Sequence, residues 1–63
     1  MLNVEKLRDL RKKKGLSQRD VSARLGLAPA AYGHYENGIR TPSIETACKI
    51  AKLYGVKVEQ LVK

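Results

Sequence analysis

The sequence predicts an all-α fold, a compact bundle of four or five short helices. Apolar residues recur three and four positions apart, no segment alternates with a period of two, and a glycine follows each of the first four helical segments. The 63 residues have room for one hydrophobic core, so we expect residues 1–63 to form a single domain. A lone cysteine and a lone histidine allow neither an internal disulfide nor a zinc site. We therefore expect folding by packing alone in a reducing cytoplasm, with no metal or cofactor.

The first helix is expected from residue 4 to about residue 14. Its apolar stripe lies among charged residues and consists of Val4, Leu7 and Leu10. Lysines at 12–14 place positive charge at the carboxyl end, where the helix dipole favours it, and Gly15 is expected to end the helix.

The second helix is expected from Ser17 to about residue 25. Ser17 is a typical N-cap, with Asp20 as its capping-box partner three residues later. Val21 and Leu25 share one face of this helix, and Gly26 is expected to end it.

The third helix is expected from about residue 28 to Asn37. Pro29 suits the first helical position because its missing N–H is not needed there. Ala28 at the cap and Gly33 inside the helix should each cost about 1 kcal/mol of helix stability. Asn37 and Gly38 tolerate a left-handed backbone and close the helix.

The fourth helix is expected from its cap, Ser43, to residue 54, with a short last turn at 58–62. Its inner face has helical spacing and consists of Ile44, Ala47, Cys48, Ala51 and Tyr54. On this face Cys48 is expected to be a small buried residue and not a redox switch.

The charge balance favours a polyanionic partner. Thirteen basic residues against six acidic ones give a net charge of +7, which points to nucleic acid first and then to an anionic membrane or an acidic protein. A solubilising surface is the alternative. No apolar stretch approaches the roughly 20 residues that span a bilayer. A membrane-surface role for the first fourteen residues is disfavoured because the bundle needs Leu7 and Leu10 inside.

A helix-turn-helix is the pattern that these segments make together. The residues that carry it are Leu10-Arg11, Gly15-Leu16-Ser17-Gln18, Val21, Leu25-Gly26-Leu27, Tyr35-Glu36-Asn37-Gly38, Pro42-Ser43 and Gly55-Val56. Through them the chain resembles the lambda-repressor-like (Cro-type) helix-turn-helix family, in register from Leu7 to Leu61. The resemblance implies a compact five-helix domain in which helices 2 and 3, about 17–37, form the motif. Helix 3 would then enter the major groove of DNA.

The resemblance also implies which residues face DNA. Gln18, at the start of helix 2, would hold a phosphate, and Asn37 and Arg40 would hold the next stretch of backbone. The positions that face base edges are Pro29, Ala30, Ala31 and His34. His34 is equally well explained as an ordinary solvated imidazole.

The base-facing positions depart from the family pattern, which usually has polar side chains there. Three interpretations remain open. Small side chains let helix 3 sit deeply, with methyl groups against thymine methyls and His34 or the Tyr32 hydroxyl as the polar contact. Alternatively, DNA shape supplies the specificity while phosphate contacts dominate the affinity. In the third interpretation the domain has turned to a protein partner.

Two further residue sets have structural roles in the family. Arg11 and Glu36 match a buried ion pair that anchors helix 3, the alternative being two solvated charges. An apolar surplus near the carboxyl end offers a dimer interface, although the same residues could simply complete the core: Leu53, Val58, Leu61 and Val62. A two-fold dimer would present two recognition helices to a near-palindromic operator.

The function that the sequence favours is a sequence-specific double-stranded DNA-binding transcriptional regulator that acts by occupying an operator. A protein-interaction module, such as an antirepressor or an antitoxin, is the alternative. An enzyme is not expected, because no Ser–His, Cys–His or carboxylate pair lies at a useful helical spacing.

Overall fold

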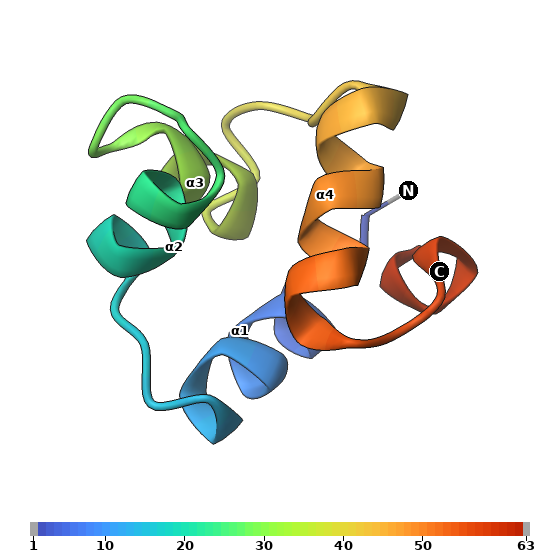
Figure 1. The fold of residues 1–63 in the computed structure, drawn as a ribbon. Coiled ribbons are helices and arrows are strands. Elements are labelled where there is room, and N and C mark those ends of the chain that lie inside the picture. The colour runs from blue at the N-terminus through green and yellow to red at the C-terminus, as the bar shows by residue number, and fades with distance from the viewer. Residues whose placement is uncertain (1, 63) are drawn as a thin grey trace.

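The computed structural model describes residues 2–62 as four α-helices followed by one 3₁₀ turn (Figure 1). The elements are α1 (Val4–Lys13), α2 (Gln18–Arg24), α3 (Ala31–Glu36), α4 (Ile44–Tyr54) and η1 (Val58–Leu61). The all-helical prediction is confirmed, but the expectation of five helices is wrong. Four residues are too few for successive i→i+4 hydrogen bonds, so the last segment forms a single tighter turn.

Local capping signals place the starts of α2 and α4 as predicted. The Asp20 backbone N–H donates to Ser17 Oγ at 3.0 Å, and the Ser17 N–H donates back to Asp20 Oδ2 at 2.9 Å. At the start of α4, the Thr46 N–H donates to Ser43 Oγ at 3.2 Å. Both serines thus satisfy helix N–H groups that have no partner within their own helix.

Helix α3 is shorter than predicted, with six residues from Ala31 to Glu36. Pro29 lies in the preceding turn and not at the first helical position, which corrects the expected start near residue 28. Ala30 is the N-cap residue and forms no side-chain cap. Because neither Ala28 nor Ala30 carries an oxygen to accept from the helix N–H groups, the residues before Ala31 form a turn instead.

The core lies between the helices and is built from all of them. Its buried apolar residues are Leu7, Val21, Leu25, Tyr32, Ile50, Ala51, Tyr54 and Leu61. The Tyr32 and Tyr54 hydroxyls lie 2.7 Å apart in a buried hydrogen bond. The expectation that the Tyr32 hydroxyl emerges beside DNA is therefore wrong, since its ring and hydroxyl point into the core.

Cys48 is exposed, which overturns the prediction that it is buried. The buried face of α4 is defined by Ile50, Ala51 and Tyr54. At about 100° per residue, Cys48 lies more than a quarter turn away from the centre of that face. The spacing from Ile44, which suggested burial, is misleading because Ile44 is itself 85% exposed.

Helices α2 and α3 form the helix-turn-helix, on the opposite side of the molecule from α4 in Figure 1. Gly26 turns the chain between them with φ of +72°, a conformation that side chains other than glycine rarely adopt. The Leu27 N–H then donates to the Ser22 carbonyl at 2.8 Å, and Leu27 packs against the core. These contacts fix the turn between the two helices.

Candidate nucleic-acid interface

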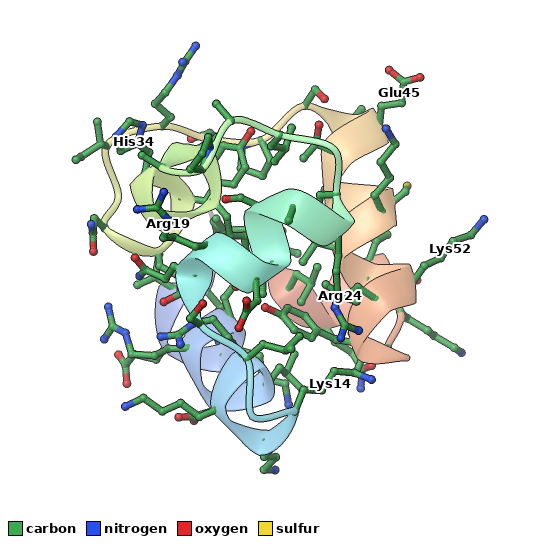
Figure 2. The ribbon with its side chains drawn as sticks, turned by 60° about the vertical axis from the view of Figure 1, so that its left-hand side comes forward. Lys14, Arg19, Arg24, His34, Glu45 and Lys52 are labelled. Atoms are coloured by element: carbon green, nitrogen blue, oxygen red, sulfur yellow. The ribbon has the colours of Figure 1, made fainter. Side chains whose placement is uncertain are left out.

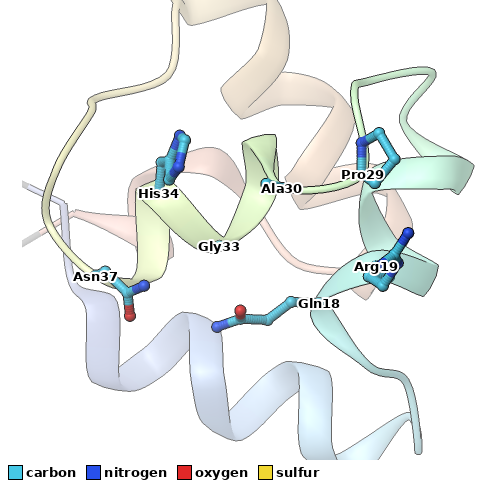
Figure 3. Close-up of a pocket in the computed structure, with 7 residues that line it drawn as sticks. All are labelled: Gln18, Arg19, Pro29, Ala30, Gly33, His34 and Asn37. Atoms are coloured by element: carbon cyan, nitrogen blue, oxygen red, sulfur yellow. The ribbon is translucent and has the colours of Figure 1, made fainter.

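A concave surface of about 330 Å³ lies between the start of α2 and the outer face of α3, and we call it the α2–α3 hollow (Figure 3). Its lining residues are Gln18, Arg19, Pro29, Ala30, Gly33, His34 and Asn37. Five of them are among the seven residues predicted to face DNA. Arg19 and Gly33 are the two that sequence reasoning missed. The sequence offered one indication for Arg19: it follows Gln18 at the capped start of α2, where Gln18 was already predicted to face DNA.

The other two predicted residues lie beside the hollow and do not line it. Ala31 begins α3 and is half-buried. Arg40 lies in the exposed loop after α3, and its backbone N–H donates to the His34 carbonyl at 3.2 Å. This bond, with that from the Ile39 N–H to the same carbonyl at 2.9 Å, keeps the loop against the end of α3.

Ser22 supplies the cap that α3 lacks in its own sequence. The Tyr32 backbone N–H donates to Ser22 Oγ at 3.0 Å, and Ser22 is fully buried. This N–H belongs to the first turn of α3 and has no partner within that helix. The Ser22 hydroxyl on α2 therefore links the two helices of the motif. Sequence reasoning missed this role because the hydrogen bond joins residues ten positions apart.

Glu36 is the centre of a polar cluster behind the hollow and is only 1% exposed. Arg11 donates two hydrogen bonds to it, from Nε to Oε2 at 2.8 Å and from Nη2 to Oε1 at 3.2 Å. Gln18 Nε2 donates to the same Oε1 at 3.0 Å. Arg8 lies at the edge of the cluster, with its Nε 3.8 Å from Glu36 Oε1. The carboxylate thus joins α1 and the start of α2 to the end of α3.

The cluster keeps Glu36 charged. Burial acts to raise the pKa of Glu36, but the hydrogen bonds from Arg11 and Gln18 outweigh it, and the pKa of Glu36 lies below its usual value. The hydrogen bond to Glu36 likewise raises the pKa of Arg11 against the effect of burial. The pKa of Tyr32 is raised, first by burial and then by its bond to Tyr54, so both the hydroxyl and the guanidinium keep their protons.

The four residues predicted as a dimer interface do not form one patch. Leu61 is fully buried in the core. Leu53 lines a second hollow of about 550 Å³ with Arg24, Leu25, Gly26, Lys49 and Lys52.

Val58 and Val62 line a third concave surface, of about 410 Å³, which we call the apolar groove. Its other lining residues are Leu2, Thr41, Pro42, Ile44 and Ala47. Within residues 2–62, this groove is where the exposed Ile44 and Val62 come together.

Basic side chains lie on several faces of the molecule (Figure 2). Within residues 2–62 no carboxylate lines the α2–α3 hollow. Figure 2 shows Arg19 and His34 on one side of the molecule and Lys52 on the other. Among the described residues, no helix is long and apolar enough to cross a membrane. No three His, Cys, Asp or Glu side chains in that part of the chain lie close enough together to hold a metal ion.

Two short helices joined by a glycine turn, with an open hollow along the second, define a helix-turn-helix domain of the lambda-repressor-like type. The comparison with known proteins agrees: a helix-turn-helix family model matches residues 7–61, and the chain belongs to this family.

Similar proteins include regulators from bacteria, a phage and an archaeon. The chain is 42% identical to the cryptic phage CTXphi transcriptional repressor RstR of Vibrio cholerae over 57 residues, which are 90% of this chain and 51% of RstR. It is 36% identical to the HTH-type transcriptional regulator AnsR of Bacillus subtilis over 97% of this chain and 53% of AnsR. An uncharacterized HTH-type transcriptional regulator of Methanocaldococcus jannaschii, MJ0272, is 38% identical over 89% of this chain and 85% of its own length. The chain spans about half the length of the first two relatives.

Proposed function

We propose that this protein is a sequence-specific double-stranded DNA-binding transcriptional regulator that occupies an operator in the cytoplasm. The observation that carries the proposal is the α2–α3 hollow, which gathers Gln18, Pro29, Ala30, His34 and Asn37 on one surface without a carboxylate. The net charge of +7 supports a polyanionic partner. The names of the similar proteins, which are transcriptional repressors and regulators, support it as well.

Each side of the hollow has its own role in this proposal. Asn37 and Arg40, at the end of α3 and in the loop after it, hold phosphates and set the register of the protein on the duplex. Pro29, Ala30 and Ala31 present methyl and ring carbons to the base edges, where thymine methyl groups are their natural contacts. His34 lines the same surface one turn further along α3 and adds a polar contact.

We further propose that the regulator acts as a homodimer on a near-palindromic operator, with half-sites roughly 34 Å apart. The apolar groove supports this, because a side chain as large as Ile44 is 85% exposed there and Val62 is 49% exposed. Val58 adds to the same surface. Leu61 is excluded from the interface by its burial, and Leu53 lies in a different hollow.

Selection of bound duplexes from a random pool tests the main proposal. We expect a sequence to be enriched at low salt, and its affinity to fall with rising salt by about 0.9 log units per log unit of salt for each phosphate contact. A scrambled duplex of the same length is the control and should bind more weakly with the same sign of salt dependence. If no duplex is enriched and a protein is captured instead, the protein-interaction alternative is favoured.

A further inference from the structure

The carboxamide of Gln18 has a fixed orientation at the edge of the α2–α3 hollow. Gln18 Nε2 donates to Glu36 Oε1 at 3.0 Å. A carboxylate only accepts hydrogen bonds, so the nitrogen faces Glu36 and Gln18 Oε1 faces the other way. Glu36 is itself held by two hydrogen bonds from Arg11. The orientation of the amide therefore follows from the buried cluster behind it.

Gly33 provides the space that the amide oxygen occupies. A Cβ at this position would lie 2.7 Å from Gln18 Oε1, closer than real Cβ atoms come, and 3.3 Å from Gln18 Cδ, which is tight. The backbone does not require glycine here, because Gly33 is a helical residue and its φ is not positive. Any larger residue at 33 would displace the Gln18 carboxamide, which explains why α3 contains a glycine despite its low helix propensity.

The oxygen is a hydrogen-bond acceptor that protein groups leave unused. In residues 2–62 Gln18 forms its side-chain hydrogen bond through the nitrogen alone, and no fully enclosed side-chain oxygen there lacks a partner. Oε1 is therefore not fully enclosed, and Gln18 itself lines the hollow. The neighbouring side chains at Pro29 and Ala30 carry no polar atom. Figure 3 shows the Gln18 side chain below α3, with its oxygen pointing toward Gly33.

We infer that Gln18 Oε1 determines base specificity by accepting a hydrogen bond from the exocyclic amine of adenine or cytosine, and that Gly33 is the residue that positions it. In the major groove, the N6 amine of adenine and the N4 amine of cytosine are donors, whereas guanine O6 and N7 and thymine O4 only accept. Phosphates also only accept, so this contact differs from the phosphate contact that the family resemblance implies for Gln18. The inference rests on the proposed DNA-binding function and assigns part of its sequence preference.

The experiment uses base analogues that lack only the amine. In the duplex selected by the wild-type protein, each adenine is replaced in turn by purine and each cytosine by 2-pyrimidinone. We expect one position in each half-site at which wild-type affinity falls about five- to tenfold, as the loss of one hydrogen bond predicts. In Gly33→Ala and Gln18→Met the same replacement should change affinity less than twofold, because the acceptor is displaced or absent.

The variants distinguish a failure of this inference from a failure of the proposed DNA-binding function. Gly33→Ala places a better helix former in α3, so it should remain folded, and circular dichroism checks this. Arg19→Gln is the matched control from the same hollow: it should weaken all duplexes alike and keep the amine discrimination. If no analogue position affects the wild type, or if Gly33→Ala keeps the full discrimination, the inference is overturned while DNA binding stands. If the wild type selects no duplex at low salt, both the inference and the proposed function fail.

Discussion

Arg11 and Glu36, twenty-five residues apart in the chain, meet through two hydrogen bonds of 2.8 and 3.2 Å. The Arg11 Nη1 atom also donates to the Leu16 carbonyl at 2.9 Å, so one guanidinium joins the end of α3 to the segment before α2. Because Glu36 is the last residue of α3, this pair fixes α3 to the scaffold while the other face of α3 borders the open hollow.

Removing one partner of this pair should be severely destabilising. We expect Glu36→Ala to lower the free energy of unfolding by about 3–5 kcal/mol, because it leaves the Arg11 guanidinium largely buried without its counter-charge. A domain of this size has a total stability of roughly 3–9 kcal/mol, so the variant should lose a large fraction of its stability. Urea titration followed by circular dichroism measures this. The double variant Arg11→Met/Glu36→Leu is the control, and a double variant no more stable than Glu36→Ala would contradict the explanation.

Stability should fall in acid partly through Glu36. Its pKa is 4.5 in the absence of interactions and lower in the folded protein, so its contribution is present above pH 4.5 and is lost as the pH falls through the folded value. In Glu36→Gln the free energy of unfolding should depend less on pH in the acid range. The difference in stability between this variant and wild type should therefore narrow as the pH falls. Urea titrations between pH 3 and pH 7 test this.

An exposed carboxylate is the control for the acid dependence. Glu59→Gln should retain the wild-type dependence. Some acid sensitivity should persist in both variants, because hydrogen bonds from the Ser17 backbone and side chain lower the pKa of Asp20. Equal pH dependence in Glu36→Gln and wild type would show that Arg11 does not stabilise the Glu36 carboxylate.

Ser22→Ala should destabilise the protein by about 1–2 kcal/mol, because it leaves the Tyr32 N–H buried without an acceptor. Amide hydrogen exchange gives a sharper test than unfolding alone. We expect the Tyr32 amide to lose protection selectively in Ser22→Ala. Ser17→Ala, which removes the exposed cap of α2, should leave the Tyr32 amide protected at comparable stability. Unchanged exchange at Tyr32 in Ser22→Ala would disprove the cross-helix cap.

Arg40→Ala and His34→Ala should affect DNA binding differently. Arg40→Ala should weaken all duplexes about equally and reduce the salt slope by about one, as expected for a lost phosphate contact. His34→Ala should change the preference among sequences with little change in slope. Fluorescence anisotropy titrations with selected and scrambled duplexes measure both. Uniform weakening by both variants would argue against a base contact from His34.

Association through the apolar groove should be sensitive to one added charge. Val62→Glu and Ile44→Glu should each shift the protein toward monomer in sedimentation velocity without DNA, because the charge would be buried at the interface. Ile39 is 68% exposed but does not line the groove, so Ile39→Glu is the control. If all three variants sediment like wild type, the groove is not the dimer interface.

The features that the sequence predicts correctly are those that depend on contacts between residues close together in the chain. The caps at Ser17 and Ser43 and the turn at Gly26 depend on contacts within a few residues, and all three were predictable. The start of α3 was not, because its cap comes from Ser22 on another helix. Gly33 has the same explanation, since the reason for a glycine there is the Gln18 side chain fifteen positions earlier.

The sequence pattern also could not predict which apolar residues near the carboxyl end are buried. Leu61 and Val62 are adjacent and both apolar, yet one is fully buried and the other half exposed. Leu61 ends the 3₁₀ turn and Val62 follows it in an extended conformation, so the two side chains point to different sides, and this end of the turn was not visible from spacing. Gln18 lies at the start of α2, as its neighbouring residues predict, whereas its bond to Glu36 depends on the packing of α1, α2 and α3 together.

The first and last described residues are joined by backbone hydrogen bonding. Leu2 and Val62 form an isolated antiparallel bridge, and the Asn3 N–H donates to the Leu61 carbonyl at 2.8 Å. A fluorophore, an affinity tag or a fused domain attached at either end would thus leave from the same corner, beside η1 and away from α2 and α3 (Figure 1). Such an attachment would therefore leave the α2–α3 hollow uncovered.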